Sequence, residues 1–271
     1  MMRSLWSAAS GMIAQQTSVD NISHNLANVN TTGYKTEKAE FKTLLYQTLQ
    51  TRTTTANGEQ KPISAQVGLG TRVASITSHF TQGALLASES YTAMAIAGDG
   101  FYSVRAADGN TYYTRNGDFK LSVGNDGNIT LVTSDGYPVL DTNGNTITLP
   151  GEVSSSKIQV STEGNIGYVD GNGNFVNVAT IGLFQFSNPA GLEKLSNSLL
   201  AVTDASGEAM NEATAANLTR SEVRQKYLEG SNVQVADEMV NLIVAQRAYE
   251  MNSKAIQASD DMLGQANQLK R

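Results

Sequence analysis

The sequence predicts an α+β fold, in which discontinuous N- and C-terminal coiled-coil helices flank an antiparallel β domain. Three observations lead to this prediction. Apolar residues recur at steps of three and four at both ends of the chain, which is the period of paired helices. In the middle, Asn-Gly and Asp-Gly pairs mark turns roughly every eight to twelve residues. Short β-rich runs such as "FYSVR" and "NITLV" lie between those turns.

The N-terminal helix is predicted over residues 1–32. We expect one apolar stripe to pair with the C-terminal helix of the same chain; it consists of Leu5, Met12, Val19, Ile22 and Leu26. A second stripe beside it contains Trp6 and Ile13. One partner helix buries only one face, so we expect the second stripe to form part of an assembly interface with neighbouring molecules.

The end of this helix carries an unusual run of asparagines in "NISHNLANVNTTGYKTEKAEF", residues 21–41. Asparagine is a mediocre helix former, so its repetition inside an apolar pattern needs a reason. Side-chain amides can bond free backbone groups at a helix end, or groups of another chain. We therefore expect Asn25, Asn28 and Asn30 to take part in the assembly interface, with Gly33 as the helix stop.

The central part divides into three predicted segments. Residues 33–94 form a connecting segment, and within it "TRTTTANGEQKPISAQ", residues 51–66, is read as an exposed arm or loop because it has few apolar residues and no period. Residues 95–204 form the antiparallel β domain. Residues 205–231 form the return connection to the C-terminal helix.

The C-terminal helix is predicted over residues 232–271 and repeats the design of the first. Its share of the intramolecular coiled coil is expected from Met239, Leu242, Tyr249, Ile256 and Leu263. A second stripe includes Met251 and Met262, which we assign to the assembly interface together with the outer stripe of the first helix. Helices of this length are marginal when alone in water, so neighbours would supply the missing burial.

Composition limits the classes of function. The net charge is −6 with no basic cluster, so no nucleic acid is expected as a partner. The absence of cysteine excludes disulfides, thiolate metal sites and a cysteine nucleophile. Apolar runs are too short to predict a transmembrane segment or a signal peptide. Composition by itself therefore favours the cytoplasm.

No sequence pattern indicates catalysis, a cofactor or a metal. "DGNGN", residues 170–174, alternates oxygen ligands like a calcium loop, but Phe175 and Ile181 stand where that loop requires glycine and glutamate. The chain has no G-x-S-x-G, H-E-x-x-H or P-loop motif. We expect no enzyme activity, no cofactor and no metal site.

The two ends resemble a known family. "LWSAASGMIAQQTSVDNISHNLANVNTTGYK" and "GSNVQVADEMVNLIVAQRAYEMNSKAIQASDDML" are similar to the N- and C-terminal signatures of the flagellar rod and hook family of axial proteins. "IAGDGFYSV", "YTRNGDFKL" and "GYPVL" resemble its β-domain motifs, and "AEFKTLLYQTL" with the total length favours the distal-rod branch. His24, Tyr34 and Gln234 are departures from the usual signatures.

The resemblance implies a structural role. It also implies a location in the flagellum in place of the cytoplasmic location that composition favours. Such proteins are exported from the cytoplasm by the flagellar type III export apparatus without a cleaved signal peptide. They then form a helical tube of identical subunits in the basal body of the bacterial flagellum. The distal rod is its drive shaft, which passes motor torque to the hook. Implied partners are further copies, the proximal rod and hook proteins, and ring bushing proteins where these exist.

Two alternatives remain at this stage. The chain could be a hook or proximal rod subunit of the same family, which its place along the axis would decide. More remotely, the β domain could bind cell-wall glycan. The sequence has no aromatic platform or carboxylate motif that favours glycan binding.

Overall fold

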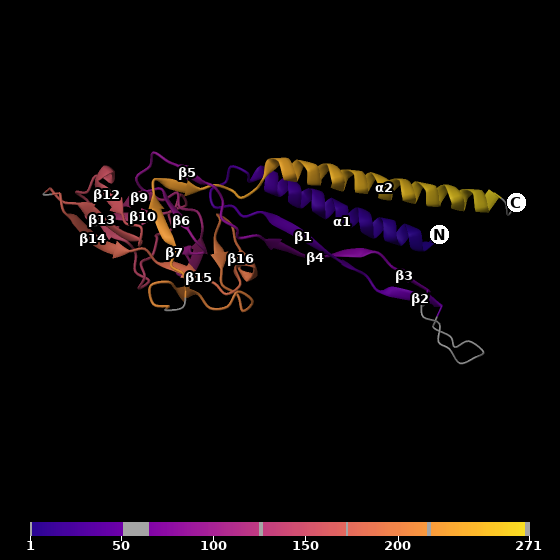
Figure 1. The fold of residues 1–271 in the computed structure, drawn as a ribbon, viewed down its shortest axis with the longest axis horizontal. Coiled ribbons are helices and arrows are strands. Elements are labelled where there is room, and N and C mark those ends of the chain that lie inside the picture. The colour runs from indigo at the N-terminus through magenta and orange to yellow at the C-terminus, as the bar shows by residue number, and fades with distance from the viewer. Residues whose placement is uncertain (1, 51–64, 125–126, 172, 216–217, 269–271) are drawn as a thin grey trace. The chain divides into compact units, whose positions relative to one another are not determined.

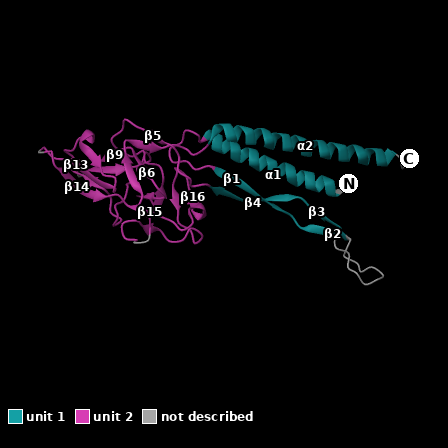
Figure 2. Cartoon of the chain, in the orientation of Figure 1, with its two compact units in different colours: residues 1–27, 37–78, 234–271 teal, residues 28–36, 79–233 magenta. Residues whose placement is uncertain are grey.

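The structure, a computed structural model, describes residues 2–50, 65–124, 127–171, 173–215 and 218–268. It confirms the predicted α+β class: one long helix lies near each end of the chain, and antiparallel strands fill the sequence between them (Figure 1). The chain divides into two compact units (Figure 2). Unit 1 contains Met1–Ala27, Glu37–Ser78 and Gln234–Arg271, and unit 2 contains Asn28–Thr36 and His79–Val233.

Unit 1 consists of two helices and two strand pairs. The helices are α1 (Met2–Ala27) and α2 (Val235–Gln268). The strand pairs are β1 (Glu37–Thr43) with β4 (Thr71–Ser78), and β2 (Tyr46–Gln50) with β3 (Ala65–Gly68). The arm or loop expected over residues 51–66 lies outside the described residues, apart from residues 65 and 66 at the start of β3.

Unit 2 holds the remaining strands and two short 3-10 helices. In chain order the strands are β5 (Leu85–Ala87), β6 (Met94–Ala97), β7 (Phe101–Arg105), β8 (Thr111–Thr114), β9 (Lys120–Val123), β10 (Ile129–Val132), β11 (Thr148–Leu149), β12 (Ile158–Val160), β13 (Asn165–Val169), β14 (Phe175–Thr180), β15 (Leu183–Gln185), β16 (Glu193–Lys194), β17 (Leu200–Ala201), β18 (Met210–Asn211), β19 (Glu222–Gln225) and β20 (Tyr227–Glu229). The 3-10 helices are η1 (Ser155–Lys157) and η2 (Pro189–Gly191).

These strands form several small antiparallel sheets. The largest has the order β16-β17-β8-β7-β15-β18, and two three-stranded sheets have the orders β11-β10-β9 and β12-β13-β14. Strands β19 and β20 pair with β6 and β5. The strands are short because the predicted turns end them. At two of these turns, Gly109 and Gly136 have φ angles of +81° and +87°, which residues with a Cβ rarely adopt.

Both hydrophobic clusters of the described residues belong to unit 2. The larger cluster surrounds Tyr102 and Phe119, whose rings meet edge to face with centroids 4.9 Å apart. The smaller cluster contains Phe101, Tyr113 and Phe186. By contrast, the buried apolar residues of unit 1 are few: Ala8, Ala14, Ile22 and Ala245. Unit 2 therefore has its own core, and unit 1 has very little apolar burial.

The strands extend beyond the sequence limits expected for the β domain. The expected connecting segment, residues 33–94, contains β1 to β5, and the expected return connection, residues 205–231, contains β18 to β20. A strand of a two-stranded ladder whose side chains are mostly exposed needs no alternating apolar pattern. "EKAEFKT" of β1 is an example, since its side chains are mostly exposed.

A buried ionic network joins distant segments of unit 2. Glu229 accepts a hydrogen bond from Lys35 Nζ at 2.6 Å and one from Arg115 Nε at 3.0 Å. Its Oε1 also accepts the backbone N–H of Gly83 at 3.0 Å. All three charged residues are less than a tenth exposed. Burial by itself raises the pKa of Glu229, but the charges of Arg115 and Lys35 outweigh burial and hold this pKa below its usual value of 4.5.

The network favours the charged form of Glu229 but not that of Lys35. Burial disfavours the charged ammonium and the Arg115 charge repels it, so the pKa of Lys35 is lowered despite the neighbouring Glu229 carboxylate. Two cations therefore share one anion. Removing that anion would take the directly bonded counter-charge away from both buried cations.

We predict that Glu229→Gln lowers the unfolding free energy of unit 2 by about 3–5 kcal/mol at neutral pH, the usual effect of removing one partner of a buried ion pair. A depressed carboxyl pKa contributes stability above the unfolded-state pKa, and that stability is lost as the pH falls through the folded-state pKa. The native chain should therefore lose stability below pH ~4.5 more steeply than the variant. Urea unfolding followed by near-ultraviolet circular dichroism measures both effects.

The matched control is Glu212→Gln. Glu212 is also buried in unit 2, but it is bonded to the neutral side chains of Ser221 and Gln185. Its substitution should produce a clearly smaller loss of unfolding free energy. Equal losses in the two variants would contradict a special contribution from the charge network.

Candidate functional site

The two helices of unit 1 run antiparallel and contact each other along most of their length (Figure 1). Three cross-helix pairs define the register: Ser4 with Ser259, Gly11 with Asn252, and Asn25 with Glu238. The residue numbers rise on one helix as they fall on the other, as an antiparallel pair requires. A Cβ atom on Gly11 would lie 2.9 Å from Asn252 Nδ2, so the helices approach closely at this point.

Both small and large side chains are buried or half-buried on the two helices. Ala8, Ala245 and Ser259 are each less than a tenth exposed. Of the residues that we expected in the intramolecular coiled coil, Ile22 is buried. The half-buried members are Leu5, Met12, Val19, Leu26, Leu242, Ile256 and Leu263.

Two expected seam residues differ from the rest, because Met239 is 52% exposed and Tyr249 is 43% exposed. The place of these two residues in the intramolecular coiled coil stays a prediction.

The outer faces of both helices carry large apolar side chains that are open to solvent. Trp6 is 72% exposed and Ile13 is 65% exposed on α1, while Met251 is 65% exposed on α2. Other exposed apolar residues of α2 are Val235, Val240, Ile243 and Met262. Exposed apolar surface of this extent typically marks a contact with another molecule. The assignment of these residues to an assembly interface remains a prediction.

Asn21 and Asn25 of α1 bind the backbone of β1, and we call this arrangement the asparagine clamp. Asn25 Nδ2 donates to Glu37 O at 2.8 Å, and Asn25 Oδ1 accepts from Glu37 N at 2.9 Å. In the amide orientation that the hydrogen-bond pattern selects, Asn21 Oδ1 accepts from Ala39 N at 3.0 Å. The clamp satisfies the edge of β1 that β4 does not cover.

Helix and strand geometry explain why asparagines four residues apart can do this. Four residues of helix rise by about 6 Å. Two residues of strand span about 6.8 Å, and Glu37 and Ala39 direct their backbone groups to the same edge. Asn21 and Asn25 therefore lie opposite successive open positions of β1.

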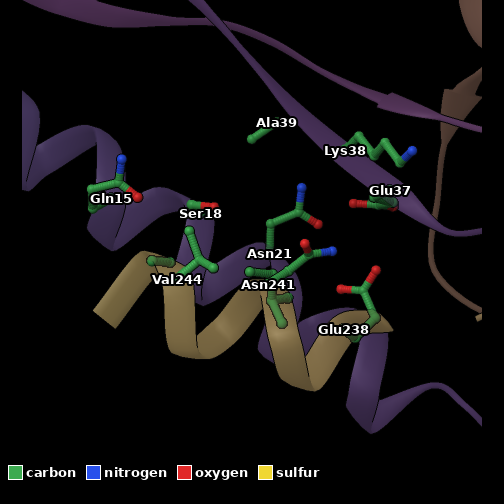
Figure 3. A pocket seen from close by; sticks show the side chains of 11 residues that line it. Gln15, Ser18, Asn21, Glu37, Lys38, Ala39, Glu238, Asn241 and Val244 are labelled. Atoms are coloured by element: carbon green, nitrogen blue, oxygen red, sulfur yellow. The ribbon is translucent and has the colours of Figure 1, made fainter. Parts of the chain in front are cut away.

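The clamp adjoins a cavity of about 360 Å³ between α1, β1 and α2. Figure 3 shows Asn21 close to Glu37 and Ala39, with Glu238 and Val244 of α2 on the opposite wall. Asn25 Nδ2 also lies 3.4 Å from Glu238 Oε2, which connects the clamp to the second helix. The site is thus a hydrogen-bonded junction of three elements.

The other asparagines of the run behave differently. Asn28 belongs to unit 2, is half-buried, and accepts a hydrogen bond from Thr31 Oγ1 at 3.0 Å. Asn30 is exposed. The structure thus gives Asn25 an in-chain role that the sequence did not indicate, and contacts of Asn25, Asn28 and Asn30 with neighbouring chains stay a prediction.

Sequence reasoning also missed Lys35, Arg115 and Glu229. An isolated charged residue in a sequence carries no sign of its partner, and Lys35 and Glu229 are 194 residues apart in the chain. The described residues contain no group of three or more histidine, cysteine, aspartate or glutamate side chains placed to hold a metal ion. Neither described helix combines the length and the apolar character needed to cross a bilayer.

Three protein-family models match the chain, and together they cover α2 and most of α1. The model for the flagella basal body rod protein matches residues 5–35. The model for the D1 domain of the flagellar hook protein FlgE/F/G matches residues 95–168. The model for the C-terminal part of the flagellar basal body rod FlgEFG protein matches residues 224–269.

Similarity to curated proteins extends over the whole chain. The chain is 46% identical to the flagellar basal-body rod protein FlgG of Borreliella burgdorferi, over all of both chains. It is 40% identical to FlgG of Agrobacterium fabrum, over 96% of this chain and 97% of the relative. It is 36% identical to FlgG of Bacillus subtilis, again over all of both chains.

We predict that Asn25→Ala exposes the edge of β1 and raises the rate of amide hydrogen exchange at Glu37. The Glu37 N–H loses its partner, whereas Glu37 O keeps a hydrogen bond from the Asn21 amide. The cost is about 1–3 kcal/mol, which corresponds to a ~5- to 150-fold faster exchange. The measurement is made at a protein concentration where circular dichroism shows both helices formed. Asn30→Ala serves as the control, because Asn30 is exposed. Unchanged exchange at Glu37 would show that the clamp does not stabilise β1.

Proposed function

The chain belongs to the flagellar basal-body rod protein family, and on that basis we propose that its copies stack helically into the distal rod and transmit motor torque to the hook. Membership places it among structural subunits of the flagellar basal-body rod, which is not an enzyme family. The proposal adds the mode of assembly, the position along the axis and the mechanical role.

The observation that carries the proposal is the unequal distribution of apolar burial. Unit 2 contains both hydrophobic clusters, whereas unit 1 exposes large apolar side chains on both of its helices. Side chains such as Trp6 and Met251 lose little contact with water when the chain folds by itself. Neighbouring copies would bury them, and the resulting driving force is the hydrophobic effect.

Helical contacts of this kind suit a shaft that resists twisting. An outer apolar stripe that runs along a helix supplies contacts at many points, and a shaft needs such contacts on every subunit. Interfaces with a fully buried centre are also the more stable ones, because a few large residues there provide most of the binding energy. The proposed role needs no catalytic residue and no cofactor.

The remaining partners follow from the proposed place in the flagellum. The distal rod would contact proximal rod proteins at one end and hook proteins at the other, with ring bushing proteins around it where a cell has them. We also propose export through the flagellar type III apparatus without removal of a signal peptide. Retention of the N-terminal residues is then a requirement for assembly, because α1 carries one of the two outer stripes.

We predict that Trp6→Ala weakens polymerisation by roughly 2 kcal/mol or more per contact, the usual threshold for a residue that dominates an interface. Trp6 is the only tryptophan, so native fluorescence should shift to the blue as copies assemble and remove its ring from water. Sedimentation measures the polymer, and basal bodies purified from cells that carry the variant show whether rods form.

The matched control is Val123→Ala, because Val123 is also 72% exposed but belongs to unit 2. Its substitution should leave polymerisation unchanged. If Trp6→Ala builds normal rods and the native fluorescence does not move, Trp6 has no place in the interface and the proposed stripe is wrong.

A further inference from the structure

We infer that Asn232 is a positioning residue that fixes the spacing of the segments through which the chain enters and leaves unit 2. The inference rests on the proposed function, because it concerns how force passes along a subunit of a shaft. It assigns that step to one amide side chain and its partners.

The chain crosses between the two units at four peptide bonds. They follow Ala27, Thr36, Ser78 and Val233 (Figure 2). Any force that passes covalently between α1 or α2 and the β unit must therefore travel through these four points. The ends on the unit 2 side are Asn28, Thr36, His79 and Val233.

Asn232 bonds directly to two of these ends and is the chain neighbour of a third. Its Oδ1 accepts the backbone N–H of Thr36 at 2.7 Å and the Thr36 hydroxyl at 2.6 Å. Its Nδ2 donates to the carbonyl of His79 at 2.9 Å and to that of Thr81 at 3.1 Å. A direct bond from His79 N to Thr36 O, 2.9 Å long, completes the arrangement.

The fourth end connects to the same region through a short turn. After Asn28 the chain turns at Thr31 to Gly33, and Gly33 N donates to the backbone carbonyl of Glu229 at 2.8 Å. Gly33 has φ +70°, and an added Cβ would lie 2.7 Å from the backbone carbon of Arg115. Only glycine has room for this backbone conformation beside Arg115, so the turn has one defined conformation.

The chemistry of an amide suits this role better than that of a charged group. An asparagine side chain offers two acceptor positions and two donor hydrogens, and Asn232 uses both kinds at once. Five hydrogen bonds of one short, stiff side chain, three of them to backbone groups, fix distances between these segments, whereas hydrogen bonds of this kind add only modest stability. We therefore expect its loss to change the spacing of these segments more than the stability of unit 2.

The test compares Asn232→Ala with Asn211→Ala in the full chain. Asn211 is a half-buried asparagine of unit 2 whose amide also binds backbone groups, at Thr142 O and Ala213 N, but it joins none of the four crossing segments. In purified protein, Asn232→Ala should speed amide exchange at Thr36 and His79, and Asn211→Ala should not. The urea midpoint of unit 2 should be similar in the two variants.

The second readout is cryo-electron microscopy of basal bodies from cells that carry each variant. With Asn232→Ala, density for α1 and α2 should stay ordered in the rod while density for unit 2 is lost or blurred; with Asn211→Ala both should stay ordered. Thr36→Val removes only the hydrogen bond from the Thr36 hydroxyl, so it should cause a weaker loss of the density for unit 2. This variant replaces Asn232→Ala in the test if Asn232→Ala forms no rods.

Two results would overturn the inference. One is unchanged exchange at Thr36 and His79 in Asn232→Ala. The other is a fall in the urea midpoint of unit 2 large enough to explain the blurred density, which would make Asn232 an ordinary stabilising residue. Absence of the native chain from purified rods would instead refute the proposed function, so the two failures can be told apart.

Discussion

The structure depends on one constraint, which is where apolar side chains can be buried. Unit 2 closes around two hydrophobic clusters and can be stabilised by its own side chains. The buried apolar residues of unit 1 are mostly alanines, and large side chains such as Trp6, Ile13 and Met251 are exposed. Since helices gain most of their stability from packing of an apolar face, unit 1 is incomplete in a single chain. We propose that assembly into a rod supplies the missing surface.

Polar contacts have a different task, because they determine geometry where apolar burial is scarce. The asparagine clamp aligns β1 with α1, and Glu238 extends that junction to α2. In unit 2, Glu229 forms ion pairs with Lys35 and Arg115, which come from distant parts of the chain. Buried groups of this kind favour one arrangement of their partners, because leaving a buried polar group without a hydrogen bond costs free energy. In the proposed shaft, such groups would help each subunit to keep one shape under torque.

The periodic and turn-forming parts of the sequence were sufficient to predict the fold class. Heptad spacing indicated both helices, and Asp-Gly and Asn-Gly pairs indicated the β unit, where "FYSVR" became β7. Periodicity shows which residues share a helix face, but it does not show which of two apolar faces points inward. Met239 and Tyr249, which their spacing assigns to the intramolecular coiled coil, are 52% and 43% exposed, and that assignment stays a prediction. Long-range partners such as Arg115 and Glu229, 114 residues apart, leave no local pattern at all.

The central claim is that unit 2 folds by itself and that unit 1 is completed by neighbouring copies. The most direct measurement is amide hydrogen exchange of the native chain, recorded for the dilute monomer and for assembled rods. The account predicts slow exchange throughout the core of unit 2 in both states, with exchange in α1 and α2 fast in the monomer and strongly slowed in the rod. Equal protection of both helices in a verified monomer and in the rod would contradict it.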